Sequence, residues 1–176
     1  KEIGLNKTIY ESGSFRDPAG RIFFHKDSVY REVFPAGVER IKFLKDKNIL
    51  KEIIDNGFLI ESQEVNNLNF EITNKNSTIV KHEKLKFISY PYEWTFNELK
   101  DAALFHLNFQ LFLLEKNAKL VDASAYNIQF RRNKPIFIDL LSIDKYNEGE
   151  YWNAHKQFCE NFLNPLILKA KKGINF

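Results

Sequence analysis

Three polar residues in the middle of the chain have the types and spacing that could hold a metal ion on a phosphate group. Asp122 precedes Asn127 by five positions, and Asp139 ends an apolar run that follows a basic turn. Carboxylate and amide oxygens are hard ligands of the kind that bind Mg²⁺. In phosphoryl transfer the metal neutralises charge while a nearby carboxylate orients the acceptor. These residue types therefore indicate a candidate site for metal-assisted phosphate chemistry.

A β-hairpin would have to position two of these residues. Alternating apolar residues before the basic turn and an apolar run after it predict two short strands. If the turn centres on residues 132–133, Ile128 pairs with Phe137, and opposed residues on antiparallel strands lie about 4.5–5.5 Å apart. This register places Asn127 beside Asp139 at one end of the hairpin, with the first aspartate on the loop that leads into it.

A purely structural role for the same side chains is the alternative. Asp122 could cap a turn, Asn127 could hold a tight turn, and Asp139 could end a strand by accepting hydrogen bonds from backbone amides. The Asp-to-Asn spacing alone is common in proteins. The hairpin, the second aspartate and a long helix before them favour the metal site.

The first half of the chain is rich in predicted strands. The segments at 21–25 and 28–33 flank a Lys-Asp turn and predict a hairpin, and further strands are expected at 58–62, continuing around Glu64 and Val65, and at 84–92. Apolar residues at helical spacing cover 38–56, with a break at Lys-Asn near the middle. A glycine just after this run is expected to end the second helix.

The second half is predicted to be mainly helical. Thr95 and Glu98 form a capping box, and the helix that follows should run to about Lys116 with apolar residues on more than one face. A last helix is expected at about 151–172. Pro165 should kink or divide this helix, because proline donates no backbone hydrogen bond.

The composition favours a folded domain and argues against several classes of protein. The chain has 176 residues, of which 44% are hydrophobic, and this is sufficient for a core. A net charge of +3 is too mild for a nucleic-acid-binding face. No apolar run is long enough for a membrane span. The single Cys159 cannot form an internal disulfide, so we expect a cytoplasmic protein; the absence of Met suggests that the chain is not a complete translation product.

Several collinear segments resemble a known family. The Asp122-to-Asn127 spacing followed by Asp139 is similar to that of protein kinases, and in particular of aminoglycoside/choline phosphotransferases. More closely, the chain from about residue 13 to 168 resembles the kinase-like N-terminal part of bacterial SAM-dependent methyltransferases, some of them nodulation-related. The segments that carry this resemblance are DPAGRIFF (17–24), FISYPYEW (87–94), LKDAALFHL (99–107), DASAYNIQF (122–130), FIDLLS (137–142) and HKQFCENFLNPL (155–166).

The resemblance implies an α+β, two-lobed, kinase-like fold. Residues 1–92 would form a strand-rich, nucleotide-binding N-lobe, and residues 93–176 a helix-rich C-lobe with the catalytic-loop-like hairpin. Only about 37 residues follow Asp139, so the C-lobe would be truncated and the chain would be the N-terminal part of a longer protein. The segment 90–94 would be the hinge.

The same resemblance implies roles for the three polar residues. Asp122 would be the catalytic base that orients or deprotonates an acceptor hydroxyl. Asn127 and Asp139 would be the ligands of Mg²⁺.

The resemblance also implies a nucleotide site, from which the chain departs in two ways. Tyr90 and Tyr92 lie in the hinge segment where adenine would bind. Arg31 stands where kinases have the phosphate-binding Lys, and Glu39 or Glu52 would pair with it. Arg differs from Lys in shape and reach. No glycine-rich loop of the G-x-G-x-x-G type is present.

Three functions follow and stay open at this stage. The first is a phosphotransferase-like domain that binds ATP and Mg²⁺ and acts on a small-molecule or sugar-like acceptor. The second is an inactive, pseudokinase-like module that recruits substrate for an attached methyltransferase, or regulates it. The third is a non-enzymatic interaction domain. The chain lacks a Rossmann-type glycine turn, so SAM would bind only in a domain outside it. Neither nucleic acid nor a membrane is an expected partner.

Overall fold

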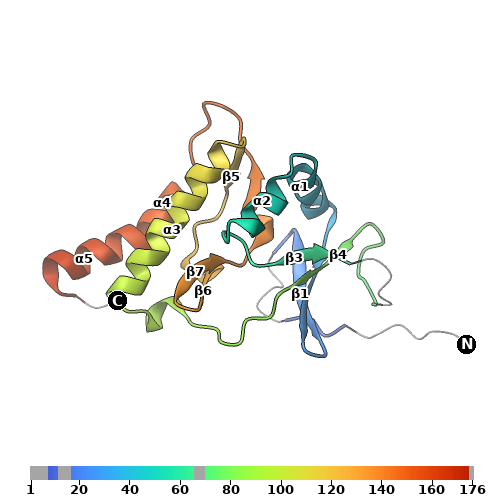
Figure 1. Cartoon of the computed structure of the whole chain (residues 1–176), viewed down its shortest axis with the longest axis horizontal. Coiled ribbons are helices and arrows are strands. Elements are labelled where there is room, and N and C mark those ends of the chain that lie inside the picture. The colour runs from blue at the N-terminus through green and yellow to red at the C-terminus, as the bar shows by residue number, and fades with distance from the viewer. Residues whose placement is uncertain (1–7, 12–16, 66–69, 175–176) are drawn as a thin grey trace, which may run out of the picture. The chain divides into compact units, whose positions relative to one another are not determined.

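A computed structural model of the protein describes residues 8–11, 17–65 and 70–174 and shows a mixture of helices and strands (Figure 1). The chain divides into two compact units. Unit 1 comprises Lys1–Asn56 and Ile60–Lys84, and unit 2 comprises Gly57–Leu59 and Leu85–Phe176. The predicted lobe boundary after Tyr92 lies inside unit 2, and the kinase-like two-lobed fold itself stays a prediction.

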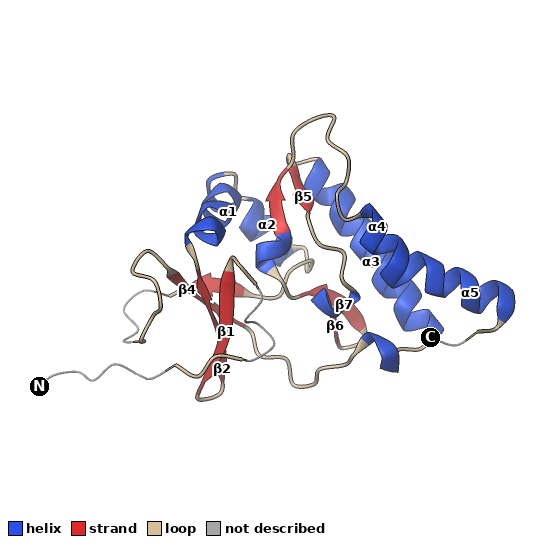
Figure 2. Cartoon of the chain, turned by 180° about the vertical axis from the view of Figure 1, so that it is seen from behind, coloured by secondary structure: helices blue, strands red, loops and turns tan. Residues whose placement is uncertain are grey.

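Unit 1 contains a four-stranded antiparallel sheet with the strand order β1-β2-β4-β3 (Figure 2). The strands are β1 (Gly20–His25), β2 (Ser28–Val33), β3 (Ser62–Glu64) and β4 (Thr78–His82). The predicted hairpin at 21–33 is confirmed, because Phe23 pairs with Tyr30 and His25 with Ser28.

One strand prediction from the first half of the chain is confirmed in part and another is wrong. The strand expected from 58 to about Val65 is the shorter β3, and the one expected at 84–92 is replaced by β4, which ends at His82. The reason is burial. Ile79 of β4 joins the core of unit 1, whereas Phe87 in the expected strand is 73% exposed.

The two helices of unit 1 are α1 (Pro35–Asp46) and α2 (Ile49–Asp55), which confirms both the predicted helices and the break between them. Asn48 at the break adopts a left-handed conformation with φ of 58°. Gly57, directly after the C-cap of α2, has φ of 73°, a conformation that glycine adopts without steric cost.

The core of unit 1 is aromatic. The rings of Phe23 and Tyr30 stack at 5.4 Å, and Phe70 meets Phe23 edge-on at 5.0 Å. Such pairs stabilise a core beyond the area that they bury.

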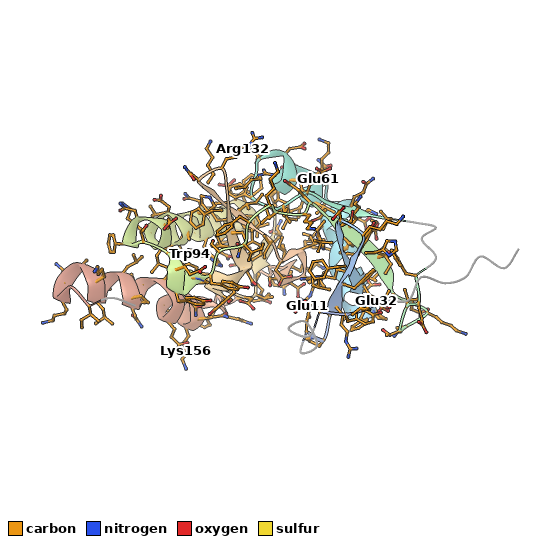
Figure 3. All side chains as sticks on the ribbon, turned by 90° about the horizontal axis from the view of Figure 1, so that it is seen from below. Glu11, Glu32, Glu61, Trp94, Arg132 and Lys156 are labelled. Carbon is orange, nitrogen blue, oxygen red and sulfur yellow. The ribbon has the colours of Figure 1, made fainter. Side chains whose placement is uncertain are left out.

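A buried carboxylate ties a loop to this sheet. Glu32 of β2, labelled in Figure 3, is 0% exposed and accepts hydrogen bonds from Tyr10 Oη (2.5 Å), Thr73 N (2.8 Å) and Asn74 N (3.1 Å). Burial by itself would raise the pKa of Glu32, but these hydrogen bonds outweigh it and lower the pKa below the ordinary value. Glu32 is therefore held ionised.

Unit 2 is built around α3 (Phe96–Leu114), and the predicted capping box is confirmed. Thr95 Oγ1 accepts from Glu98 N at 3.3 Å, and a Glu98 carboxylate oxygen accepts from Thr95 N at 2.7 Å. Phe109 and Leu113 of α3 are fully buried. The apolar residues on more than one face of this helix thus fit its central place in the unit.

Two pairs of short strands accompany α3 in unit 2. The predicted hairpin is β6 (Ile128–Arg131) with β7 (Lys134–Phe137). The second pair, β5 (Ala118–Leu120) with β8 (Ile143–Lys145), was not predicted. Two further short turns of helix are η3 (Ala125–Asn127) and η4 (Leu140–Ser142).

The C-terminal helical segment runs alongside α3 in both views (Figures 1 and 2). It consists of α4 (His155–Phe158), a π-helical turn η5 (Cys159–Leu163) and α5 (Asn164–Lys172). Pro165 divides the helix as predicted. Its ring crowds the carbonyl four residues earlier and it donates no hydrogen bond, so an ordinary α-helical turn is disfavoured just before it.

Aromatic side chains form the core of unit 2. Phe58 stacks on Phe109 at 4.9 Å, and Phe109 meets Phe137 edge-on at 5.5 Å. Phe137 N also donates to Phe58 O, which explains why residues 57–59 belong to this unit. Both tryptophans of the chain, Trp94 and Trp152, lie in unit 2.

Among the described residues, no helix has both the length and the apolar character that crossing a membrane would require.

Candidate functional site

The hairpin that carries the candidate ligands has the predicted register. Ile128 lies opposite Phe137, and Ile138 N donates to Asn127 O at 2.9 Å. Arg132 and Asn133 in the turn have φ of 51° and 62°. Two successive left-handed residues are typical of the type I′ turn that suits the twist of a two-residue hairpin. The Arg132 side chain at the tip extends away from the ribbon (Figure 3).

One serine joins the two candidate metal ligands. Ser142 Oγ donates to Asp139 Oδ2 at 2.5 Å, and Asn127 Nδ2 donates to Ser142 Oγ at 3.4 Å. Ser142 is only 4% exposed, so its hydroxyl depends on these partners. The structure therefore brings Asn127 and Asp139 to the same hydroxyl group.

This arrangement orients both side chains. Because Nδ2 of Asn127 faces Ser142, its Oδ1 points away from the serine, and Oδ1 is the atom with which an amide binds a metal. Asp139 accepts the serine hydrogen bond through Oδ2. The two oxygens of its carboxylate therefore differ, because Oδ2 is the one bound to the serine hydroxyl. An amide and a carboxylate oxygen presented in this way fit the ligand preference of Mg²⁺.

Asp122 is anchored separately, on the segment of residues 121–127 that we call the Asp122 loop. Its Oδ1 accepts from Ser124 N at 2.6 Å, a local turn of the kind that aspartate favours. The loop ends in η3, where Asn127 N donates to Ser124 O at 3.1 Å. The loop thus leads directly from Asp122 to Asn127, as the hairpin prediction required.

A buried histidine from α3 contacts the same loop. His106 is 0% exposed, and its Nε2 lies 3.4 Å from Asp122 O. A carbonyl only accepts, so Nε2 carries the proton. Burial among aromatic rings, including Trp152 and Phe162, lowers the pKa of His106 to about 4, while the bond to Asp122 O opposes this shift. His106 is therefore neutral near pH 7.

The predicted hinge tyrosines lie in unit 2. Tyr90 and Tyr92 stack with ring centroids 5.5 Å apart and planes within 2°, and the two residues are 45% and 65% exposed. They flank Pro91 in the short helix η2 (Pro91–Glu93), where Glu93 accepts from Tyr90 N at 2.8 Å. The pair offers a flat aromatic surface.

The remaining predicted nucleotide-binding residues lie in unit 1. Arg31 on β2 is 8% exposed, and its Nη1 lies 3.8 Å from Asp17 Oδ2. Glu39 is exposed on α1, and Glu52 is half-buried on α2. The choice between these two glutamates as the partner of Arg31 stays a prediction.

Four side chains that contact the candidate residues or the strand just before the Asp122 loop were not predicted from the sequence. Ser142 and His106 are described above. Gln110 Oε1 accepts from Leu120 N at 2.7 Å, and Trp152 Nε1 donates to Leu120 O at 2.9 Å, so together they hold the end of β5 just before the Asp122 loop. A polar residue within the apolar helix α3 was the available signal for His106 and Gln110.

Comparison with known proteins identifies a relative of this chain, whose structure is a mixture of helices and strands with a candidate metal site. No family model matches the chain. It is similar to the nodulation protein NoeA of the bacterium Rhizobium meliloti (strain 1021), with 42% identity over 160 residues. The alignment covers 90% of this chain and 33% of NoeA, so the chain spans about a third of the length of that relative.

Proposed function

We propose that this chain is a kinase-like domain that binds a nucleotide together with Mg²⁺ and works as part of a larger protein. The observation that carries the proposal is the joint hydrogen bonding of Asn127 and Asp139 to Ser142. The similarity to a relative three times as long supports the association with a larger protein. The spacing of Asp122, Asn127 and Asp139 supports the resemblance to phosphotransferases.

In this proposal each residue of the site has a distinct task. Asn127 Oδ1 and Asp139 would hold Mg²⁺, which would neutralise charge on the nucleotide phosphates. Asp122 would orient or deprotonate a hydroxyl of an unidentified small-molecule acceptor. The stacked Tyr90 and Tyr92, which belong to the same unit as these three residues, would lie against the base.

A second candidate is an inactive, pseudokinase-like module that recruits substrate for a methyltransferase domain of the same polypeptide, or regulates it. Two observations favour it over an active kinase. Arg31, which by the resemblance would replace the phosphate-binding Lys, is largely buried and pairs with Asp17. The chain also contains no glycine-rich loop. A third reading, a non-enzymatic interaction domain, leaves the three polar residues with structural roles only.

Calorimetric titration of ATP tests the proposal, with Mg²⁺ present or removed by chelation. The variants are Asp139→Asn, which removes a ligand charge without changing shape, and Asp101→Asn, which changes an exposed aspartate of α3 in the same way. We expect binding that requires Mg²⁺, is lost in the Asp139 variant and is unchanged in the Asp101 variant. An absence of Mg²⁺-dependent binding to the wild-type protein would contradict the proposal.

Transfer of labelled phosphate to candidate acceptors would then separate the first two readings. An active phosphotransferase should lose transfer in Asp122→Asn while it keeps Mg-ATP affinity. A protein that binds Mg-ATP but transfers no more phosphate than this variant would be the inactive module.

A further inference from the structure

The backbone N–H groups of the Asp122 loop each have an identified acceptor between residues 123 and 127. Three of these bonds are local. They run from Ser124 N to Asp122 Oδ1, from Tyr126 N to Ser124 Oγ and from Asn127 N to Ser124 O. The other two donors, Ala123 N and Ala125 N, have no local acceptor.

Those two donors are satisfied from the C-terminal helical segment. Ala123 N donates to Gln157 Oε1 at 2.8 Å, and Ala125 N donates to Asn161 Oδ1 at 3.2 Å. Ala123 is 0% exposed and Ala125 is 2% exposed, so these two residues are shielded from water in the folded protein. A buried N–H without a partner is strongly destabilising, and the loop conformation therefore depends on the two amide side chains.

The two acceptors form an ordered pair on one face of the helical segment. They are four residues apart, and Asn161 Nδ2 donates to Gln157 O at 3.1 Å, which fixes the direction of the Asn161 amide. Lys156 and Glu160 form a parallel pair with 3.7 Å between charged atoms and side chains that are 86% and 56% exposed. In Figure 3 the Lys156 side chain extends away from the ribbon, so this second pair belongs to the outer face.

We propose that Gln157 and Asn161 are positioning residues that hold the Asp122 loop in the geometry of the candidate site. Gln157 acts beside Asp122 through the Ala123 N–H, and Asn161 acts two residues before Asn127 through the Ala125 N–H. That this loop geometry serves a metal-nucleotide site rests on the proposed function. The C-terminal segment thereby has an indirect role in the site, because Gln157 Oε1 and Asn161 Oδ1 accept from backbone N–H groups of the loop.

Residue-resolved amide hydrogen exchange on the whole chain, without added ligand, tests the inference first. Gln157→Leu should speed exchange at Ala123 about tenfold, and Asn161→Leu should do the same at Ala125, since each leaves its donor without an acceptor. Gln157→Glu and Asn161→Asp keep an acceptor oxygen and should restore protection. Lys156→Leu and Glu160→Leu are the matched controls from the outer face. Equal acceleration of all core amides, or no change at the two alanines, would overturn the inference.

Mg-ATP titration of the same variants then tests whether the geometry of the Asp122 loop affects nucleotide binding. We expect Asn161→Leu to weaken Mg-ATP affinity about tenfold, the size of effect usual for groups that orient metal ligands, with recovery in Asn161→Asp. Gln157→Leu, which acts beside Asp122, should keep the affinity, as is expected of Asp122→Asn. Unchanged affinity in Asn161→Leu would overturn the positioning role. If the wild-type protein binds no Mg-ATP, the proposed function fails, and the hydrogen-exchange result alone decides whether the two residues hold the loop.

Discussion

Ser142 is a small residue on which the orientation of two larger ones depends. Its hydroxyl accepts from Asn127 and donates to Asp139, so neither side chain needs a metal to take up its orientation. Preorganised ligands lose less conformational entropy when a metal binds. Ser142 therefore belongs to the candidate site as much as the ligands themselves.

Replacement of Ser142 by Ala should weaken Mg-ATP binding about tenfold, because the Asn127 amide and the Asp139 carboxylate lose their common partner. Ser142→Thr keeps the hydroxyl and should retain most of the affinity. Calorimetric titration measures both, and urea unfolding of each variant separates an effect on the site from an effect on the fold. Equal affinity in the wild-type protein and Ser142→Ala would show that the serine does not organise the ligands.

His106 should make the stability of the protein depend on pH. The unfolded chain binds a proton at this residue near pH 6.5, while the folded chain resists protonation until about pH 4. The pKa is lowered on folding, so His106 has no effect on stability above pH 6.5 and reduces it as the pH falls toward 4. Since a tenfold change in proton affinity is equivalent to about 1.4 kcal/mol, the loss at pH 4.5 should be roughly 2–3 kcal/mol.

His106→Gln removes the titration and keeps an N–H donor for Asp122 O. We expect the variant to lose less stability than the wild-type protein when unfolding by urea is measured at pH 7 and again at pH 4.5. The same loss in both proteins would mean that another group causes the acid sensitivity.

At the scale of elements, the start of α3 offers a simple test of local stability. Thr95 Oγ1 satisfies the Glu98 N–H, one of the donors that a helix leaves without an internal partner. Thr95→Ala should lower the free energy of unfolding by about 1 kcal/mol, and Thr95→Ser, which keeps the oxygen, should lower it by much less. Urea unfolding followed by circular dichroism measures both. A free energy of unfolding in Thr95→Ala equal to that of the wild-type protein would contradict the capping role.

The elements with strong local signals could be predicted from the sequence. The capping box at Thr95, the break before α2 and the register of the β6–β7 hairpin are encoded in residues close together in the chain. β4 was missed and a strand was expected at 84–92 instead, because each segment contains a short apolar run, at 79–80 and at 87–88. The difference between them comes from core packing at long range.

The candidate site likewise contains residues that the local sequence marks and residues that it does not. Asp122, Asn127 and Asp139 could be selected because type and spacing mark them. Ser142, although only three residues after Asp139, has no distinctive local pattern. Gln157 and Asn161 act on backbone N–H groups more than 30 residues away, and side chain-to-backbone hydrogen bonds of this kind leave no periodic trace in the sequence.

At the scale of the whole molecule, the two units should respond differently to acid. Glu32 stabilises unit 1 above its unfolded pKa of about 4.5, and this contribution is lost only as the pH falls through its lowered folded pKa. His106 in unit 2 already reduces stability below pH 6.5. Between pH 6.5 and 4.5 we therefore expect unit 2 to weaken before unit 1.

Two spectroscopic signals can follow this difference. Both Trp94 and Trp152 lie in unit 2, so tryptophan emission reports on that unit, whereas far-ultraviolet circular dichroism reports on both. In an acid titration in moderate urea, the tryptophan emission should change at a higher pH than the pH at which the dichroism change is complete. In His106→Gln the two transitions should coincide more closely. Coincident transitions in the wild-type protein would show that the units unfold together.

The position of the single cysteine has a practical consequence. Cys159 is a free, partly buried thiol at the start of the π-helical turn, with Sγ 3.8 Å from His155 Nε2, and it lies between Gln157 and Asn161 in sequence. A thiol-directed nitroxide or fluorophore would attach to the natural sequence at this one place. The protein thus already contains an attachment point for a probe on the helical segment that holds the Asp122 loop.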